Sequence, residues 1–221
     1  MQTLLLGSGG WIPTSRRETC SALVRHDRRA LLIDAGTGVS RLVEDTSLLD
    51  GVDQLDIVLT HFHLDHVCGL TYLPGLPVLP TIHAPGAWLY GTPSAELLAP
   101  LLGAPISPSE IRAPIRELRA GPQSIGEFTV TARAQPRHWH PTAGLRVEDA
   151  LALITDTGYD PGSAELARDV EHLLHEAWTP GDECDASEDD ARRVAREAGA
   201  RRLTLMHLHP RDPRNHDGLE L

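Results

Sequence analysis

The sequence has 221 residues, with 31 Asp and Glu side chains against 20 basic ones, which gives a formal net charge of −11. All the basic residues are arginines, and the absence of lysine excludes catalysis through a lysine Schiff base or a lysine-anchored pyridoxal cofactor. The negative charge disfavours nucleic acid and anionic membranes as partners, because both attract local positive charge.

No apolar run approaches the roughly 20 residues that span a bilayer, and the N-terminal residues lack a basic leader. We therefore expect no membrane contact and a cytoplasmic protein. Three widely spaced cysteines without a C-x-x-C pattern fit reduced thiols in that compartment. Without repeats or long linkers, the length predicts a single domain over residues 1–221.

Strand patterns occur throughout the chain, and several are continuous apolar runs, which are typical of strands covered on both faces. In chain order the predicted strands are Gln2–Leu6, Cys20–Arg25, Ala30–Asp34, Leu55–Thr60, Val78–His83, Phe128–Ala134, Leu145–Val147, Leu151–Thr155, His172–Glu176 and Arg202–Met206. Helices are predicted over Val39–Glu44, Ala95–Leu102, Ala164–Asp169 and Ser187–Ala198. Because early strands follow one another and later ones alternate with helices, we expect packed sheets with helices outside them, a layered α/β domain.

The strongest local feature is T-H-F-H-L-D-H, Thr60–His66, which directly follows the apolar strand L-D-I-V-L. Three imidazoles and a carboxylate this close together need a shared partner when buried, and their nitrogen and oxygen donors suit zinc. One turn does not wrap all of them around a single ion, because His61 and His63 share one side of an extended segment while Asp65 and His66 diverge after the bend. The pattern therefore indicates two metal ions.

Each of two ions needs further ligands from later in the chain. The candidates follow predicted strands: His138 or His140 after F-T-V-T-A-R-A-Q-P, Asp156 after L-A-L-I-T, and His207 after L-T-L-M. The position after the strand leaves the choice between His138 and His140 open.

These motifs resemble the metallo-β-lactamase fold superfamily, and within it the ribonuclease Z-like branch, over nearly the whole chain. G-S-G-G-W-I-P (residues 7–13) and L-L-I-D-A-G-T-G (31–38) are similar to the opening hairpins and the D-x-G turn of that branch. Its later motifs are similar to H-W-H-P-T-A-G-L-R (138–146), T-D-T-G (155–158), L-L-H-E-A (173–177) and L-M-H-L-H-P (205–210). The resemblance implies a four-layer αββα sandwich, and a homodimer is common among such proteins.

Carried over residue by residue, the resemblance implies two zinc ions, with manganese or iron as alternatives. The first ion is held by His61, His63 and His138, the second by Asp65, His66 and His207, and Asp156 bridges the two. His138 is preferred to His140 because its spacing to Pro141, Gly144 and Arg146 fits the family's H-x-x-P-x-x-G-x-R segment. Asp65 also contacts the bridging hydroxide in the family, which gives it a catalytic role, and Asp34 is expected to support a ligand histidine.

The resulting prediction is a dinuclear zinc-dependent hydrolase in which a metal-bridging hydroxide attacks a small-molecule substrate. The ribonuclease Z-like register favours a phosphodiester, and a lactone, ester or thioester is the alternative because the metal centre alone does not choose between phosphorus and carbon. A non-hydrolytic metal-binding module is a further hypothesis. The Pro/Gly-rich segment Leu73–Pro114 is expected to overhang the metals. Four aromatic residues are candidates to line an apolar pocket, with core packing as the more common role for each: Trp88, Tyr90, Trp139 and Trp178.

Three features disfavour a tRNA 3′-processing endonuclease. Asp156 lies 18 positions after His138, which leaves no room for the long arm with which ribonuclease Z grips tRNA. Asp185 stands where that family carries a histidine that partners the H-E-A glutamate, so Glu176 is expected to face another carboxylate. The net charge of −11 also opposes an RNA-binding surface.

Overall fold

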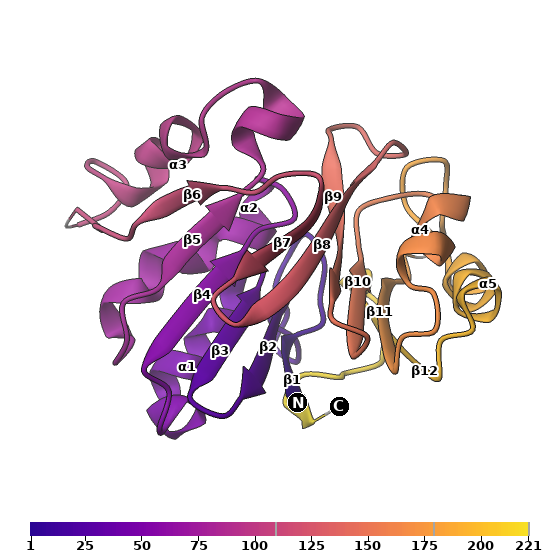
Figure 1. Ribbon diagram of the computed structural model, residues 1–221, viewed down its shortest axis with the longest axis horizontal. Coiled ribbons are helices and arrows are strands. Elements are labelled where there is room, and N and C mark those ends of the chain that lie inside the picture. Colours follow the sequence, from indigo (N-terminus) through magenta and orange to yellow (C-terminus); the bar gives the residue numbers. More distant parts are fainter. Residues whose placement is uncertain (109, 179, 221) are drawn as a thin grey trace.

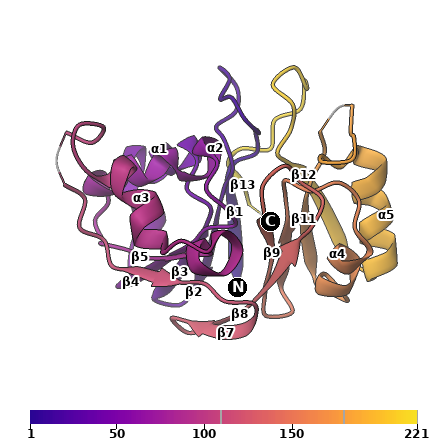
Figure 2. The ribbon, with the colours of Figure 1, turned by 90° about the horizontal axis from the view of Figure 1, so that it is seen from above.

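A computed structural model describes residues 1–108, 110–178 and 180–220. Two β-sheets pack against each other, and helices cover the outer face of each sheet (Figure 1). Viewed from above, the layers run from α1 and α3 on one side, through the two sheets, to α4 and α5 on the other (Figure 2). This arrangement confirms the predicted αββα architecture.

The first sheet has the strand order β13-β1-β2-β3-β4-β5-β6, antiparallel from β13 to β3 and parallel from β3 to β6. Its strands are β1 (Gln2–Gly7), β2 (Ser21–His26), β3 (Arg29–Ile33), β4 (Gln54–Val58), β5 (Thr81–Ala84), β6 (Ile115–Glu117) and β13 (Leu219–Glu220). The helical segments between them are η1 (Thr37–Val39), α1 (Ser40–Glu44), η2 (Thr46–Leu49), α2 (Leu64–Val67), η3 (Cys68–Gly75), η4 (Gly86–Tyr90) and α3 (Ser94–Leu102).

The second sheet has the order β12-β11-β10-β9-β8-β7, antiparallel from β7 to β10 and parallel from β10 to β12. Its strands are β7 (Gly121–Ile125), β8 (Phe128–Gln135), β9 (Thr142–Val147), β10 (Leu151–Ile154), β11 (His172–Glu176) and β12 (Arg202–Met206). Helices α4 (Pro161–Leu166) and α5 (Glu188–Ala198) link its parallel strands and pack on its outer face.

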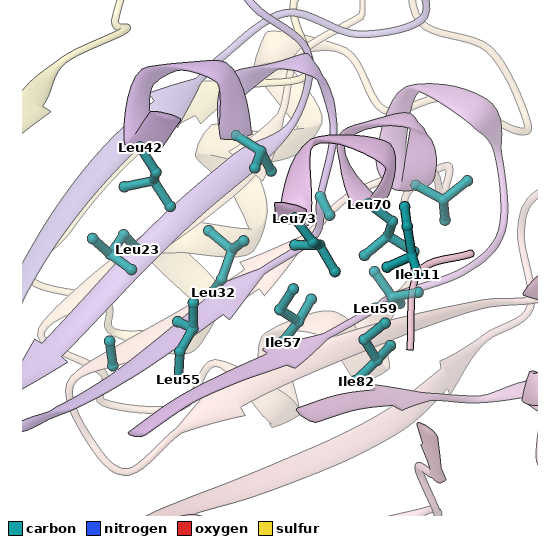
Figure 3. Close-up of a cluster of buried hydrophobic side chains, with 14 of the residues drawn as sticks. Leu23, Leu32, Leu42, Leu55, Ile57, Leu59, Leu70, Leu73, Ile82 and Ile111 are labelled. Carbon is teal, nitrogen blue, oxygen red and sulfur yellow. The ribbon is translucent and has the colours of Figure 1, made fainter. Parts of the chain in front are cut away.

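Alternating residues of the central strands bury opposite faces, because successive side chains of a strand point in opposite directions. In β3, Leu32 packs under the helices of the first outer layer, whereas Leu31 and Ile33 pack against the second sheet (Figure 3). In β10, Leu153 faces the first sheet and Ile154 faces α4 and α5. Burial on both faces explains why these strands read as continuous apolar runs.

The predicted strands are all present, with bounds that differ by a few residues. The sequence patterns missed β6, β7 and β13 as well as α2, and they placed the start of α4 at Ala164, although the helix begins at Pro161 with Asp160 as its N-cap. None of the helices in the described ranges is long and apolar enough to cross a membrane.

Candidate metal centre

The predicted metal ligands stand beyond the carboxyl ends of strands at one end of the sandwich, where loops of open α/β sheets carry functional groups. His61 follows β4, and His63 precedes α2, which contains Asp65 and His66. The remaining ligands come from the second sheet: His138 from the loop after β8, Asp156 after β10 and His207 after β12. The structure brings all of these side chains together around Asp156.

Three imidazoles surround one oxygen of the Asp156 carboxylate. Its Oδ1 atom lies 3.6 Å from His61 Nε2, 3.8 Å from His63 Nδ1 and 3.8 Å from His138 Nε2. Donors that share one tetrahedral zinc ion with bonds of about 2.1 Å lie about 3.4 Å apart. The spacing of this first set therefore suits a single cation.

A second set surrounds the other oxygen of the same carboxylate. Asp156 Oδ2 lies 3.2 Å from His66 Nε2 and 3.5 Å from His207 Nε2. Asp65 Oδ2 lies 3.3 Å from each of those two nitrogens. Asp156 thus presents one oxygen to each set, which is the geometry required of a bridging ligand.

Both sets contain buried nitrogens that have no hydrogen-bond partner among the described residues. Within the described part of the chain, the Nε2 atoms of His61, His66 and His138 are buried and form no hydrogen bond. An unsatisfied buried polar group costs about 1–3 kcal/mol, so these atoms require a partner that the protein does not supply. A cation fits, because imidazole nitrogen and carboxylate oxygen are donors that zinc and similar divalent metals accept.

Hydrogen bonds on the far side of the rings fix their orientation. His66 Nδ1 lies 2.8 Å from Asp34 Oδ2, and Asp34 Oδ1 also accepts the Thr60 N–H at 2.7 Å. His61 Nδ1 lies 2.9 Å from Thr60 Oγ1, and His138 Nδ1 lies 3.0 Å from the carbonyl oxygen of Cys184. Such contacts turn the opposite nitrogen toward a metal site, and they confirm the supporting role expected for Asp34.

Three residues of the site that follow strands have strained backbone conformations. Asp34, Asp156 and His207 have φ values of 57°, 52° and 48°, in the left-handed region that residues other than glycine seldom occupy. Such conformations cost about 1–3 kcal/mol each and cluster at functional sites. The fold therefore holds three residues of the site in unfavourable conformations.

Burial and neighbouring carboxylates shift the pKa values of two histidines at the site in opposite directions. Burial lowers the pKa of His61 well below its ordinary value, which keeps this imidazole neutral. Burial opposes charge on His66 as well, yet Asp65, Asp156 and Asp34 outweigh it and hold the pKa of His66 well above its ordinary value. A divalent cation can replace such a proton, because it neutralises the same carboxylates.

A cleft of about 280 Å³ opens onto the two sets of side chains. Its walls include Trp11, Trp139, Trp178 and Asp185. Of the four aromatic candidates, Trp139 and Trp178 line the cleft, whereas Trp88 and Tyr90 make the packing and hydrogen-bond contacts that were the alternative. Trp88 packs against the core between the sheets, and Tyr90 donates its hydroxyl hydrogen to the carbonyl oxygen of Pro141 at 2.5 Å.

The Pro/Gly-rich segment also lies elsewhere than expected. The described residues between 73 and 114 contribute no side chain to the walls of the cleft. Within this segment, α3 packs against η3 and β6, on the outer side of the first sheet. Helix α3 therefore covers the outer side of the first sheet, and the described side chains of the segment do not form a wall of the cleft.

His138 and His140 occupy different positions relative to the centre. The His138 side chain is 6% exposed, and its Nε2 faces Asp156 Oδ1. His140 is exposed, and its ring packs edge-on against His63 with centroids 5.6 Å apart. This geometry favours His138 as the ligand.

The expectation that Glu176 faces Asp185 is wrong. Glu176 Oε1 accepts hydrogen bonds from the backbone N–H groups of Thr157 and Ala186, and its Oε2 lies 3.5 Å from His207 Nδ1. Asp185 Oδ1 instead lies 3.7 Å from His138 Nδ1. Each carboxylate thus stands behind a different histidine of the centre.

Two contacts at the centre carried little or no signal in the sequence. The backbone N–H of Trp11 donates to Asp65 Oδ2 at 2.8 Å, and the G-S-G-G-W-I-P motif is the only hint of that approach. Cys20 is fully buried, with its Sγ atom within 4.8 Å of ring nitrogens of His66 and His207. A single cysteine at a strand start has no pattern that would point to this position.

The family model of the metallo-β-lactamase superfamily matches residues 16–146. The chain therefore belongs to this superfamily, and it combines the fold with a His/Asp cluster of the kind that can hold metal ions. Ribonuclease Z from Mycolicibacterium paratuberculosis is 31% identical to it over 251 aligned residues, which cover 95% of this chain and 86% of that protein.

Two solved structures show the same fold. The short form of human tRNase Z superposes with a TM-score of 0.77 at 19% identity, covering 100% of this chain and 98% of that chain. A diphosphatase of the PhnP family superposes with a TM-score of 0.76 at 18% identity, covering 100% of this chain and 96% of that one.

Proposed function

We propose that the protein is a dinuclear zinc hydrolase that cleaves a small phosphodiester. The observation that carries this proposal is the division of donors around Asp156, with Oδ1 facing His61, His63 and His138 and Oδ2 facing His66 and His207. Two zinc ions, when bound there, activate water near neutral pH and polarise the oxygen of the bond under attack.

The chain itself supplies the group that orients the nucleophile. Asp65 Oδ2 lies at the wall of the cleft, between the nitrogens of His66 and His207, and the Trp11 N–H holds it from the third side at 2.8 Å. A carboxylate fixed in this way orients a water molecule in the cleft by accepting a hydrogen bond from it.

The similar proteins favour phosphorus over carbon as the electrophilic atom. The names of these relatives, a ribonuclease, a tRNase and a diphosphatase, all denote cleavage of phosphate esters or anhydrides. A small substrate is favoured over tRNA because the chain has no room for a long arm that grips tRNA. Between β9 and β10 it has only a turn of residues 148–150. The alignment with ribonuclease Z spans 251 positions, more than the 221 residues of this chain, so that relative carries segments that this chain lacks.

A hydrolysis panel tests the proposal. Protein purified without chelator is assayed with bis-p-nitrophenyl phosphate, a lactone, a thioester and a β-lactam, before and after chelator treatment. We expect about two zinc ions per chain and turnover of the phosphodiester that chelator abolishes and zinc restores. Less than one ion per chain, or hydrolysis of the carbon substrates with an inert phosphodiester, would overturn it. The variants His63→Ala and Asp156→Ala should lose both metal and turnover.

A further inference from the structure

The mouth of the cleft is flanked by two indole rings on separate loops. Trp11, in the loop after β1, is 65% exposed, and Trp139, in the loop after β8, is 76% exposed. Both line the cleft, although large apolar side chains are normally buried. Exposed apolar surface around a concave site marks a place where a ligand binds.

Trp178 forms the fixed wall of the same cleft. Its ring lies 5.5 Å from the ring of His207 and 4.8 Å from that of His209, measured between centroids. These two contacts hold this indole against the centre. The indoles of Trp11 and Trp139 therefore remain as the flat, accessible faces that a ligand can contact.

The charges of the cleft limit the charge of the ligand. Its acidic side chains are Asp65, Asp156 and Asp185, and among the residues that the structure describes no arginine side chain lines it. Among the groups that face the cleft directly, two divalent cations set against Asp65, Asp156 and a hydroxide leave one positive charge. With no lysine in the chain, a second negative charge on the substrate has no partner, and Asp185 repels it.

From these observations we infer an aromatic-binding subsite formed by Trp11 and Trp139, which selects a singly charged phosphodiester with a planar aromatic substituent. The inference rests on the proposed function, because it assumes that the phosphoryl group sits at the metal centre. Stacking on an exposed indole strengthens binding about 10-fold per ring and tolerates many ring types. Trp11 and Trp139 are then specificity-determining residues.

Direct binding tests the subsite without relying on turnover. Phosphinates are singly charged and, with two carbon–phosphorus bonds, are not hydrolysed. The zinc-loaded protein is titrated with dimethylphosphinate, methyl(phenyl)phosphinate and a phosphinate that carries a purine, and affinity is followed by calorimetry and tryptophan fluorescence. The dianion phenylphosphonate, at pH 9, tests the charge limit. The purine and phenyl arms distinguish a nucleobase from a simple aryl group as the natural substituent.

We expect an aromatic phosphinate to bind at least about 10-fold more tightly than dimethylphosphinate and than the dianion. Trp139→Leu should weaken aromatic binding about 10-fold and leave dimethylphosphinate within about 2-fold, whereas Trp139→Phe should restore most of the loss. Trp11→Leu should likewise weaken aromatic binding about 10-fold. Trp88→Phe, outside the cleft, is the matched control and should change nothing.

Equal affinity for dimethylphosphinate and the aromatic phosphinates in the wild-type protein would overturn the subsite while leaving the proposed function standing. An unchanged preference in both leucine variants, or tighter binding of the dianion, would also overturn it. If zinc-loaded protein bound none of the phosphinates, both the subsite and the phosphodiesterase proposal would fail.

Discussion

At the scale of single residues, the centre consists of buried ring nitrogens and carboxylate oxygens that require a cation as their partner. Local motifs were enough to predict Thr60–His66, Asp156 and His207, because each directly follows an apolar strand. They were not enough for Trp11, whose contribution is a backbone N–H, nor for Trp88 and Tyr90, whose side chains point into packing contacts. Side-chain direction in a loop depends on tertiary contacts, which residue type alone does not reveal.

Substitution of the two neighbouring histidines separates their roles. His138→Ala removes a nitrogen that faces Asp156 Oδ1, so we expect it to lose about one metal ion per chain and at least about 100-fold in turnover. His140→Ala should keep both ions, because its exposed ring only packs against His63. Metal content by mass spectrometry checks this. Loss of metal in the His140 variant with full content in the His138 variant would reverse the assignment.

The buried His175 predicts how stability depends on pH. Burial lowers the pKa of His175 to about 4, whereas the unfolded chain has the ordinary value of 6.5. Between these values the unfolded state binds more protons than the folded state. The contribution of His175 to the free energy of unfolding is therefore fully present above about pH 6.5 and is lost as the pH falls toward 4. A histidine with this pKa shift lowers the free energy of unfolding by about 2 kcal/mol between pH 7.5 and pH 5.

We therefore expect urea denaturation of His175→Gln to show about 2 kcal/mol less pH dependence than the wild type over that range. His26→Gln, at an exposed histidine, is the control. Identical pH dependence in wild type and His175→Gln would contradict the expectation.

At the scale of elements, the long apolar strands and the capped helix could be predicted from the sequence, whereas short or irregular elements could not. β7 (Gly121–Ile125) begins with glycine and proline, which read as a turn, and pairs as an edge strand with β8. α2 has four residues, too few for a helical period to be visible. These elements form because neighbouring strands and loops complete their hydrogen bonds.

Helix α5 contains the clearest local stabilising device. The Ser187 hydroxyl accepts the Asp190 N–H at 3.2 Å, and the Asp190 carboxylate accepts the Ser187 N–H at 3.0 Å. Ser187→Ala removes one half of this capping box, and we expect a loss of about 1 kcal/mol in the free energy of unfolding. Urea denaturation measures it, with Ser15→Ala at an exposed loop serine as control. A loss no larger than that of the control would contradict the capping role.

At the scale of the whole molecule, the loop after β1 and the segment after β12 meet beside the centre. The loop after β1 and the C-terminal segment after β12 rise side by side at one end of the sandwich (Figure 2). The buried guanidinium of Arg17 donates to the carbonyl oxygens of His209, Asp212 and Arg214. Arg17 therefore fixes the segment that follows His207 to the loop that carries Trp11.

Arg17→Met should release that segment. The variant leaves three carbonyl groups without their charged donor, and we expect it to lower the free energy of unfolding by about 3 kcal/mol. Trypsin should cleave after Arg211 and Arg214 faster than in the wild type. The exposed Arg16 offers a matched control, Arg16→Met. Equal cleavage rates in the two variants would show that Arg17 does not hold the segment.

The most direct test of the dinuclear centre is X-ray diffraction from zinc-soaked crystals, recorded on both sides of the zinc absorption edge. We predict two anomalous peaks about 3.5 Å apart, one on the side of Asp156 Oδ1 beside His61, and the other on the side of Oδ2 beside His66. A single peak, or none, with the histidine rings turned away from Asp156, would contradict the account.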